Sequence, residues 1–120
     1  IHNAYKEELK NVKGITTITI NPELENNGHP YFPIFIDEKE YGKTRDELYY
    51  YLRENNYYGR RYFYPLISQF PNYRGLNSAT PENLPVAEKI TQKVICLPIY
   101  PELQLETVKK ITDIIKNFTQ

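Results

Sequence analysis

A polar stretch from residue 67 to residue 81 separates two apolar parts of this 120-residue sequence. Pro71, Gly75 and Pro81 fall within it, and proline and glycine interrupt helices and strands. The stretch is therefore expected to form an exposed loop of about 15 residues. A loop of that length in a compact domain is usually functional, or it packs on a surface outside the domain.

Before this loop, periodic apolar residues predict four elements. They are two helices at residues 4–12 and 45–55 and two strands at residues 15–20 and 31–36. Isoleucine and threonine alone make up the first strand, as suits a half-buried position. Thr44 followed by Glu47 fits a capping box at the start of the second helix. A turn is expected at residues 26–28, and a loop is expected at residues 37–42.

Around and after the loop, the sequence predicts four more elements. They are strands at residues 61–66 and 94–97 and helices at residues 85–93 and 105–115. Pro65 ends the first of these strands, and Pro85 suits the first turn of a helix because its missing N–H would have no partner there. The residues expected to pack this helix against the last one are Leu84, Val86, Ile90 and Val94.

This order of elements predicts a single domain of the α+β class that spans residues 1–120. Helices are expected to pack on one side of a small antiparallel or mixed sheet. The sequence contains no methionine, and we therefore expect it to be a segment of a longer protein.

The charges of the chain balance. Lysine and arginine number 15, aspartate and glutamate number 15, and the formal net charge is zero. No long-range field therefore attracts nucleic acid or an anionic membrane. No apolar run approaches the roughly 20 residues that cross a bilayer, and no signal peptide opens the sequence. We expect a cytoplasmic protein without nucleic-acid or membrane partners.

The residues that most often bind metals are few and scattered. The single cysteine, Cys96, cannot form an internal disulfide, and its apolar neighbours predict a buried, inert thiol in a strand. His2 and His29 are far apart in the sequence, and neither forms a spaced cluster with Cys96 or with carboxylates. No metal-binding residue is therefore assigned.

The segment from Tyr57 to Leu66, with the sequence YYGRRYFYPL, combines adjacent arginines with several tyrosines. Guanidinium groups bind phosphate or carboxylate through paired hydrogen bonds, and phenol rings stack on a base or donate to a sugar. The alternative is structural, with Phe63 in the core and tyrosines covering a sheet edge. On a strand, Tyr62 and Tyr64 would share one face, and Arg61 and Phe63 the other.

Five short motifs occur here in an order that resembles a known family. They are YFPI at residues 31–34, RDEL at 45–48, GRRYFYPL at 59–66, NLPVAEKI at 83–90 and CLPIYP at 96–101. Together they resemble the DegT/DnrJ/EryC1/StrS sugar aminotransferases along nearly the whole chain. The resemblance implies the C-terminal small domain of a fold-type I transferase, separated from the large domain that holds pyridoxal phosphate.

For the parent protein, the resemblance implies a homodimer that moves an amino group from glutamate to a nucleotide-linked keto-deoxysugar, of the dTDP-linked type. The lysine that binds the cofactor would lie in the large domain, so no catalytic or cofactor-binding residue is assigned here, and the isolated chain is expected to be inactive. The substrate-binding candidates that the resemblance implies are Arg60, Arg61, Tyr62 and Tyr64, with Arg60 or Arg61 near the pyrophosphate and Tyr62 or Tyr64 near the sugar or base. Ile67 stands where many members of the family carry histidine.

Two other interpretations are compatible with the residues. The chain could be a free-standing module that binds a nucleotide or peptide through its tyrosine-rich segment, and it would then have nucleotide affinity of its own. It could instead be an oligomerisation domain whose tyrosines anchor an interface, and it would then associate without ligand.

Overall fold

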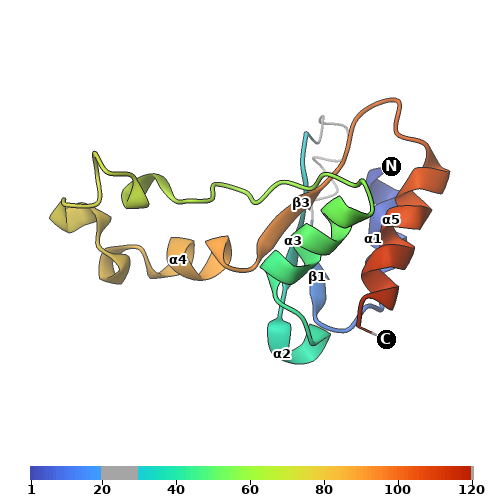
Figure 1. Cartoon of the computed structure of the whole chain (residues 1–120), viewed down its shortest axis with the longest axis horizontal. Helices are drawn as coiled ribbons and strands as arrows, with labels where there is room; N and C mark the ends of the chain where they lie inside the picture. Colours follow the sequence, from blue (N-terminus) through green and yellow to red (C-terminus); the bar gives the residue numbers. More distant parts are fainter. Residues whose placement is uncertain (20–29, 120) are drawn as a thin grey trace.

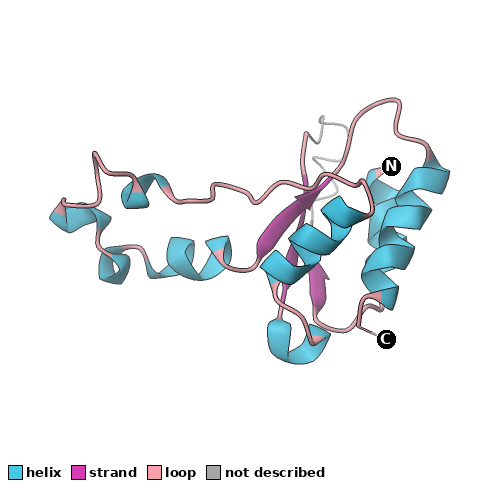
Figure 2. Ribbon diagram, in the orientation of Figure 1, coloured by secondary structure: helices cyan, strands magenta, loops and turns pink. Residues whose placement is uncertain are grey.

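The structure, a computed structural model, describes residues 1–19 and 30–119. Within that part of the chain, the strands form one antiparallel sheet (Figure 2). In spatial order they are β1 (Ile15–Thr17), β2 (Phe32–Ile36) and β3 (Val94–Leu97). Both pairings are antiparallel, so the sheet is not a mixed one.

The central strand β2 divides the sheet into a covered face and a more open face. Phe32, Ile34 and Ile36 are buried, whereas Pro33 and Phe35 between them are half-buried. Successive side chains of a strand point to opposite faces, so the three buried residues share one face. That face is where the core forms.

Helices cover this face (Figure 1). The long ones are α1 (His2–Leu9), α3 (Arg45–Glu54) and α5 (Leu105–Asn117). Their buried side chains join those of the sheet in one cluster, which includes Tyr5, Leu9, Leu48, Leu52, Val108, Ile111 and Ile115. The predicted α+β architecture, with helices on one side of a small sheet, is confirmed.

Local sequence explains where these helices begin and which side they bury. The Thr44 side chain accepts a hydrogen bond from the backbone N–H of Glu47 at 3.1 Å, and the Glu47 carboxylate accepts one from the Thr44 N–H at 2.8 Å. The predicted capping box is therefore confirmed. In α5, Val108, Ile111 and Ile115 recur at helical spacing and are all buried.

A short helix, α2 (Glu38–Tyr41), occupies the segment for which the sequence predicted a loop, and that prediction was wrong. The Asp37 side chain caps its first turn, and Gly42 ends it with a left-handed φ of 85°. Tyr41 is buried, and its hydroxyl donates to the Ile115 carbonyl at 2.6 Å. This long-range bond fixes α2 against α5.

Residues 65–92 leave the body as an extended arm (Figure 1). Its elements are three single 3-10 turns and one helix, namely η2 (Ile67–Gln69), η3 (Asn77–Ala79), η4 (Pro81–Asn83) and α4 (Pro85–Thr91). The radius of gyration is 15.6 Å, against about 14 Å for a compact domain of this length. The predicted exposure of residues 67–81 is confirmed, although turns punctuate the loop.

The apolar residues of α4 do not join the core, so the predicted packing of Val86 and Ile90 against the last helix was wrong, whereas Val94, in β3, is buried. Val86 is 73% exposed and Ile90 is 40% exposed. The helix lies in the arm, away from α5 (Figure 1). The arm therefore presents apolar surface that the described residues leave uncovered.

Several expectations fall at or beyond the edges of the described residues. The first predicted strand is observed only as Ile15–Thr17, and Ile20, the predicted turn at residues 26–28 and His29 lie outside the described residues. No helix in the described part is long and apolar enough to span a bilayer.

Candidate functional site

The segment that carries the adjacent arginines runs beside the edge strand β3. The Arg60 N–H donates to the Cys96 carbonyl at 2.9 Å, and the Cys96 N–H donates to the Arg60 carbonyl at 2.8 Å. Gly59 makes this approach possible, because a Cβ there would lie 3.1 Å from the Cys96 carbonyl oxygen. Gly59 therefore allows the backbone of this segment to lie close to β3.

The predicted strand at residues 61–66 does not form; the segment is irregular beyond the single bridge at Arg60. Phe63 has a left-handed φ of 46°, which is unfavourable for a residue with a side chain and breaks the extended path. Pro65 has no N–H to donate to a sheet. The Thr91 hydroxyl donates to the Phe63 carbonyl at 3.3 Å, which ties the turn to the end of α4.

Arg61 and Tyr64 are engaged by the protein itself. The Arg61 Nη1 lies 3.3 Å from the Asp46 Oδ1 in an ion pair. Its guanidinium lies between two rings, 4.6 Å from the centre of Tyr49 and 4.4 Å from the centre of Tyr64. These contacts position both side chains against α3 and give the Arg61 guanidinium a carboxylate partner, which it shares with Arg45.

Tyr62 turns toward the first residue before β2. Its ring centre lies 5.3 Å from that of Tyr31 and 4.2 Å from that of Phe63. Tyr62 thus contacts Phe63, while Tyr64 contacts Arg61. The predicted division of faces, which paired Tyr62 with Tyr64, was wrong because it assumed an extended strand.

Arg45 is the polar residue that sequence reasoning missed. It is buried, and its Nη1 donates to the carbonyls of Thr91 at 2.9 Å and Val94 at 3.0 Å. Its Nε lies 2.7 Å from the Asp46 Oδ1, as an ion pair without hydrogen-bond geometry. Its guanidinium lies 4.8 Å from the centre of the Tyr64 ring. Arg45 therefore links α3 to both ends of the arm.

One sequence signal could have indicated this role. Arg45 is the first residue of α3, and a cation at a helix N-terminus is unfavourable for the helix dipole. A residue placed against a local preference usually serves a tertiary contact or a site.

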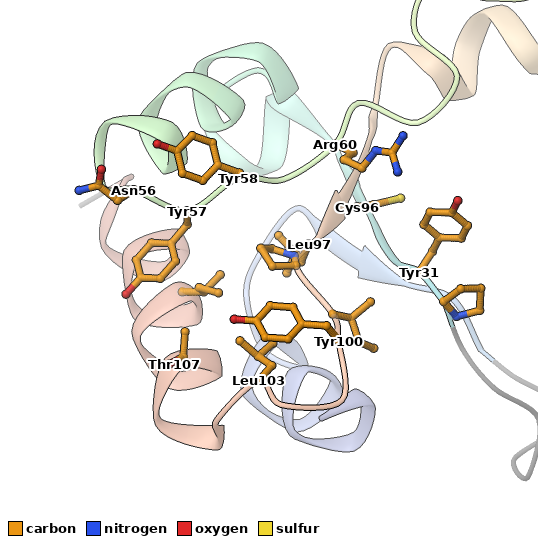
Figure 3. Close-up of a pocket in the computed structure, with 14 residues that line it drawn as sticks. Tyr31, Asn56, Tyr57, Tyr58, Arg60, Cys96, Leu97, Tyr100, Leu103 and Thr107 are labelled. Carbon is orange, nitrogen blue, oxygen red and sulfur yellow. The ribbon is translucent and has the colours of Figure 1, made fainter.

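Beside Arg60 lies an open pocket of about 440 Å³ (Figure 3). Tyr57 and Thr107 stand on one side of it, Arg60 and Tyr31 on the other, and Tyr100 lies between them. The pocket is bounded by the link after α3, the end of β3, the loop after β3 and α5. Of the four predicted substrate-binding residues, Arg60 alone lines it.

The Cys96 thiol lies beside this pocket but does not have the character of a nucleophile. Cys96 is buried in β3, which confirms the predicted position. Burial raises the pKa of the thiol to about 11, and the nearby Arg60 charge offsets this effect only in part. The thiol is therefore protonated at neutral pH.

The described residues do not fit a pyridoxal phosphate site. That cofactor needs a lysine amine directed into the pocket that holds it. None of the residues lining the pocket beside Arg60 is a lysine, and several lysines elsewhere pair with carboxylates, as Lys13 does with Glu40 at 3.0 Å. Nor do three metal-ligating side chains gather anywhere in the described ranges.

Comparison with known proteins gives consistent matches. The model of the DegT/DnrJ/EryC1/StrS aminotransferase family matches residues 1–116. The chain is 46% identical over 115 residues to a dTDP-4-amino-4,6-dideoxy-D-glucose transaminase of Escherichia coli, covering 96% of this chain and 30% of that protein. A Shigella dysenteriae transaminase of the same name is 36% identical over 112 residues, covering 93% of this chain and 29% of that protein.

Solved structures match over nearly the whole chain as well. DesI, solved in the presence of its TDP-sugar product, superposes with a TM-score of 0.85 at 26% identity, covering 98% of this chain and 29% of DesI. The Helicobacter pylori aminotransferase PseC superposes with a TM-score of 0.76 at 23% identity, covering 95% of this chain and 29% of PseC, which shows a shared fold. The chain thus spans about 30% of the length of the curated relatives it matches.

Proposed function

Because the chain belongs to the DegT/DnrJ/EryC1/StrS aminotransferase family, we propose that it is the C-terminal domain of a pyridoxal-phosphate transaminase that acts on a dTDP-linked keto-deoxysugar. The 46% identity to a dTDP-sugar transaminase supports the substrate class. Since the described residues do not fit the cofactor, the catalytic lysine belongs to the remainder of the protein. The chain by itself is inactive, and the homodimer and cytoplasmic location stay predictions.

We further propose that the segment from Arg60 to Tyr64 borders the sugar-nucleotide channel. This proposal is supported by a difference in the contacts that the two arginines make. Arg61 is held by Asp46 and two rings, whereas Arg60 is exposed and has no ion pair among the described residues. An exposed guanidinium without a counter-ion favours an anionic ligand. Arg60 therefore meets the pyrophosphate, and Arg61 positions the segment.

Tyr62 and Tyr64 also differ in their contacts. Tyr62 is 36% exposed, and its ring contacts those of Tyr31 and Phe63, so its exposed part is available to sugar or base. Tyr64 is 41% exposed, and it differs from Tyr62 in that its ring packs against the guanidiniums of Arg61 and Arg45, which position the segment. These assignments make Arg60 and Tyr62 the contact residues of the proposed channel.

Ile67 lies at the start of the arm and is 59% exposed. Histidine, which many family members carry at this position, would offer a hydrogen bond where isoleucine offers only apolar contact.

The test uses the longer protein that contains this chain. With glutamate and a dTDP-linked keto-deoxysugar, we expect cofactor-dependent transamination, and Arg60→Gln should raise KM by about tenfold or more with a smaller change in kcat. Arg74→Gln, in the exposed arm, is the matched control and should leave both constants unchanged. A longer protein without transaminase activity on any nucleotide sugar, or cofactor binding by the 120-residue chain alone, would refute the proposal.

A further inference from the structure

A row of alternating arginine and tyrosine side chains, the arginine–tyrosine row, joins α3 to the segment that follows it. Three members come from α3, at positions four residues apart that share one side of the helix, and three come from residues 58–64. In spatial order they are Arg45, Tyr64, Arg61, Tyr49, Arg53 and Tyr58. Each inner member therefore lies between two residues of the other kind.

The separations in the middle of the row are short enough for cation–π contacts. The Arg61 guanidinium lies 4.4 Å from the ring centre of Tyr64 and 4.6 Å from that of Tyr49. The Arg53 guanidinium lies 5.4 Å from the ring centre of Tyr49 and 5.1 Å from that of Tyr58. Such contacts act within about 6 Å. The Tyr49 ring therefore joins two arginines, one from its own helix and one from the segment.

Two of the three guanidiniums share one carboxylate. The Asp46 Oδ1 lies 2.7 Å from the Arg45 Nε and 3.3 Å from the Arg61 Nη1. Arg53 makes no ion pair among the described residues, and its Nη1 donates to the Tyr49 hydroxyl at 3.1 Å. Because the face of an aromatic ring is its negative side, the tyrosines provide the remaining electrostatic attraction for these cations.

The row leaves out the two proposed contact residues, Arg60 and Tyr62. Both lie near Tyr31, which lines the pocket with Arg60 and whose ring centre is 5.3 Å from that of Tyr62 (Figure 3). Members of the row precede, separate and follow these two residues, at positions 58, 61 and 64. The backbone pairing of Arg60 with Cys96 supports the segment at one point, and the row supports it on both sides of that point.

We infer that Tyr49 and Arg53 are positioning residues for the proposed substrate-binding segment. They contact Arg61 and Tyr58 and so hold the segment against α3, with its two contact residues left free for the substrate. The inference rests on the proposed function for the substrate, whereas the hold of the row on the segment does not. Both residues belong to α3 and lie outside the motif at residues 59–66.

The first test uses the longer protein with glutamate and a dTDP-linked keto-deoxysugar. Tyr49→Leu removes the ring between two guanidiniums and should raise KM for the sugar nucleotide by about fivefold or more, with a smaller change in kcat. Tyr49→Phe keeps the ring and loses only the hydroxyl that accepts from Arg53, so its KM should stay within about twofold of the wild type. The matched control is Tyr51→Leu, on the same helix, which loses a stack on Phe118 instead and should leave KM unchanged.

An exchange of two exposed residues tests the pairing directly. Arg53→Tyr and Tyr58→Arg should each raise KM by about two- to fivefold, because each breaks the contact between the guanidinium and the ring. The double variant restores this pair in reverse order and should return KM to within about twofold of the wild type. Residues that serve only local packing would not show this recovery. Thermal unfolding of each variant checks that the fold is retained.

The second test needs neither cofactor nor substrate. Trypsin cleaves after arginine, and Arg60 and Arg61 lie in the segment itself. In the 120-residue chain, whose core forms within its own residues, Tyr49→Leu and both single exchange variants should be cleaved there about two- to fivefold faster. Tyr49→Phe and the double variant should match the wild type, and fragment masses identify the cleaved bonds. If the chain does not fold alone, the same comparison is made on the longer protein.

Three results in folded variants would overturn the inference. They are Tyr49→Leu with wild-type KM and cleavage, Tyr49→Phe impaired as strongly as Tyr49→Leu, and an exchange that brings no recovery. If Tyr49→Leu does not fold, the exchange of the exposed pair decides. A longer protein without transaminase activity, whose variants are cleaved faster and recover on exchange, would support the row and refute the proposed function. Transamination with KM unchanged in every variant would refute the positioning role alone.

Discussion

The buried guanidinium of Arg45 lies 4.8 Å from the centre of the Tyr64 ring, at the point where the arm leaves the body. The same guanidinium donates to the carbonyls of Thr91 and Val94, where the arm returns. The Arg45 side chain therefore contacts the protein at both ends of the arm. The direction of the arm, and the position of the segment before it, depend on this contact.

Replacing Arg45 by methionine should loosen the arm. The change removes two hydrogen bonds to carbonyls and the contact with Tyr64, so the free energy of unfolding should fall by about 1 to 3 kcal/mol. Limited proteolysis with trypsin should also become faster at Arg74 and Lys89, which lie in the arm. Fragment masses identify the cleavage site.

The matched control for this variant is Arg53→Met. Arg53 is on the same helix but is exposed, and its cationic contacts are with the rings of Tyr49 and Tyr58. Its loss should leave cleavage in the arm unchanged. If Arg45→Met does not fold, Tyr64→Leu tests the same contact, and unchanged cleavage in a folded Tyr64→Leu would refute the role assigned to it.

Gly59→Ala should destabilise the protein by about 1 to 3 kcal/mol, because the new methyl group would press on β3. The added Cβ would lie 3.1 Å from both the Cys96 carbonyl oxygen and the Ile95 Cδ1. Gly75→Ala is the control, since nothing lies within 4 Å of a Cβ at that position. Urea unfolding of both variants measures the difference. Equal midpoints would show that the segment before Arg60 moves freely.

The body of the fold could be predicted from the sequence because its signals are local. Apolar spacing placed β2, β3 and the long helices, and the Thr44 and Glu47 pair marked the start of α3. Each of these elements forms where intrinsic preference and burial agree. The family resemblance also came from short motifs, which are local by nature.

The backbone conformation of the segment that carries the candidate site could not be predicted, because it depends on contacts between residues distant in the sequence. Aromatic residues at 62–64 favour a strand by propensity, yet Arg61 is drawn to Asp46 and Phe63 adopts a left-handed φ. Likewise, the apolar residues of α4 look like core in the sequence. Their exposure follows from the arm, whose direction is fixed by Arg45.

The capping box makes the free energy of unfolding depend on pH through the ionisation of Glu47. Hydrogen bonds from the backbone and side chain of Thr44 hold the pKa of the Glu47 carboxyl below its ordinary value of 4.5. A lowered pKa in the folded state means that this stabilisation is fully present above the ordinary value, and that it is lost as the pH falls through the folded value. As the pH is lowered, the melting temperature of the wild-type protein should therefore fall further than that of the Glu47→Gln variant.

Melting curves at stepwise lower pH measure this difference. Glu54→Gln, at the exposed end of the same helix, is the control and should follow the wild-type profile. Identical slopes for wild type and Glu47→Gln below the ordinary carboxyl pKa would contradict the contribution of the capping box. Thr44→Ala should flatten the profile only in part, because the Thr44 backbone N–H still donates to the Glu47 carboxylate.

The thiol of Cys96 should report on the integrity of β3. Burial raises its pKa from 9.0 to about 11, so its thiolate fraction near neutral pH is about a hundredfold lower than that of a free thiol. An aromatic disulfide reagent should therefore label the native chain at least about a hundredfold more slowly than the urea-unfolded chain. The native rate should rise about tenfold per pH unit, as the thiolate fraction does. A folded chain labelled almost as fast as the unfolded one would show that the strand beside Arg60 opens, and the pocket built on it would then lack a fixed wall.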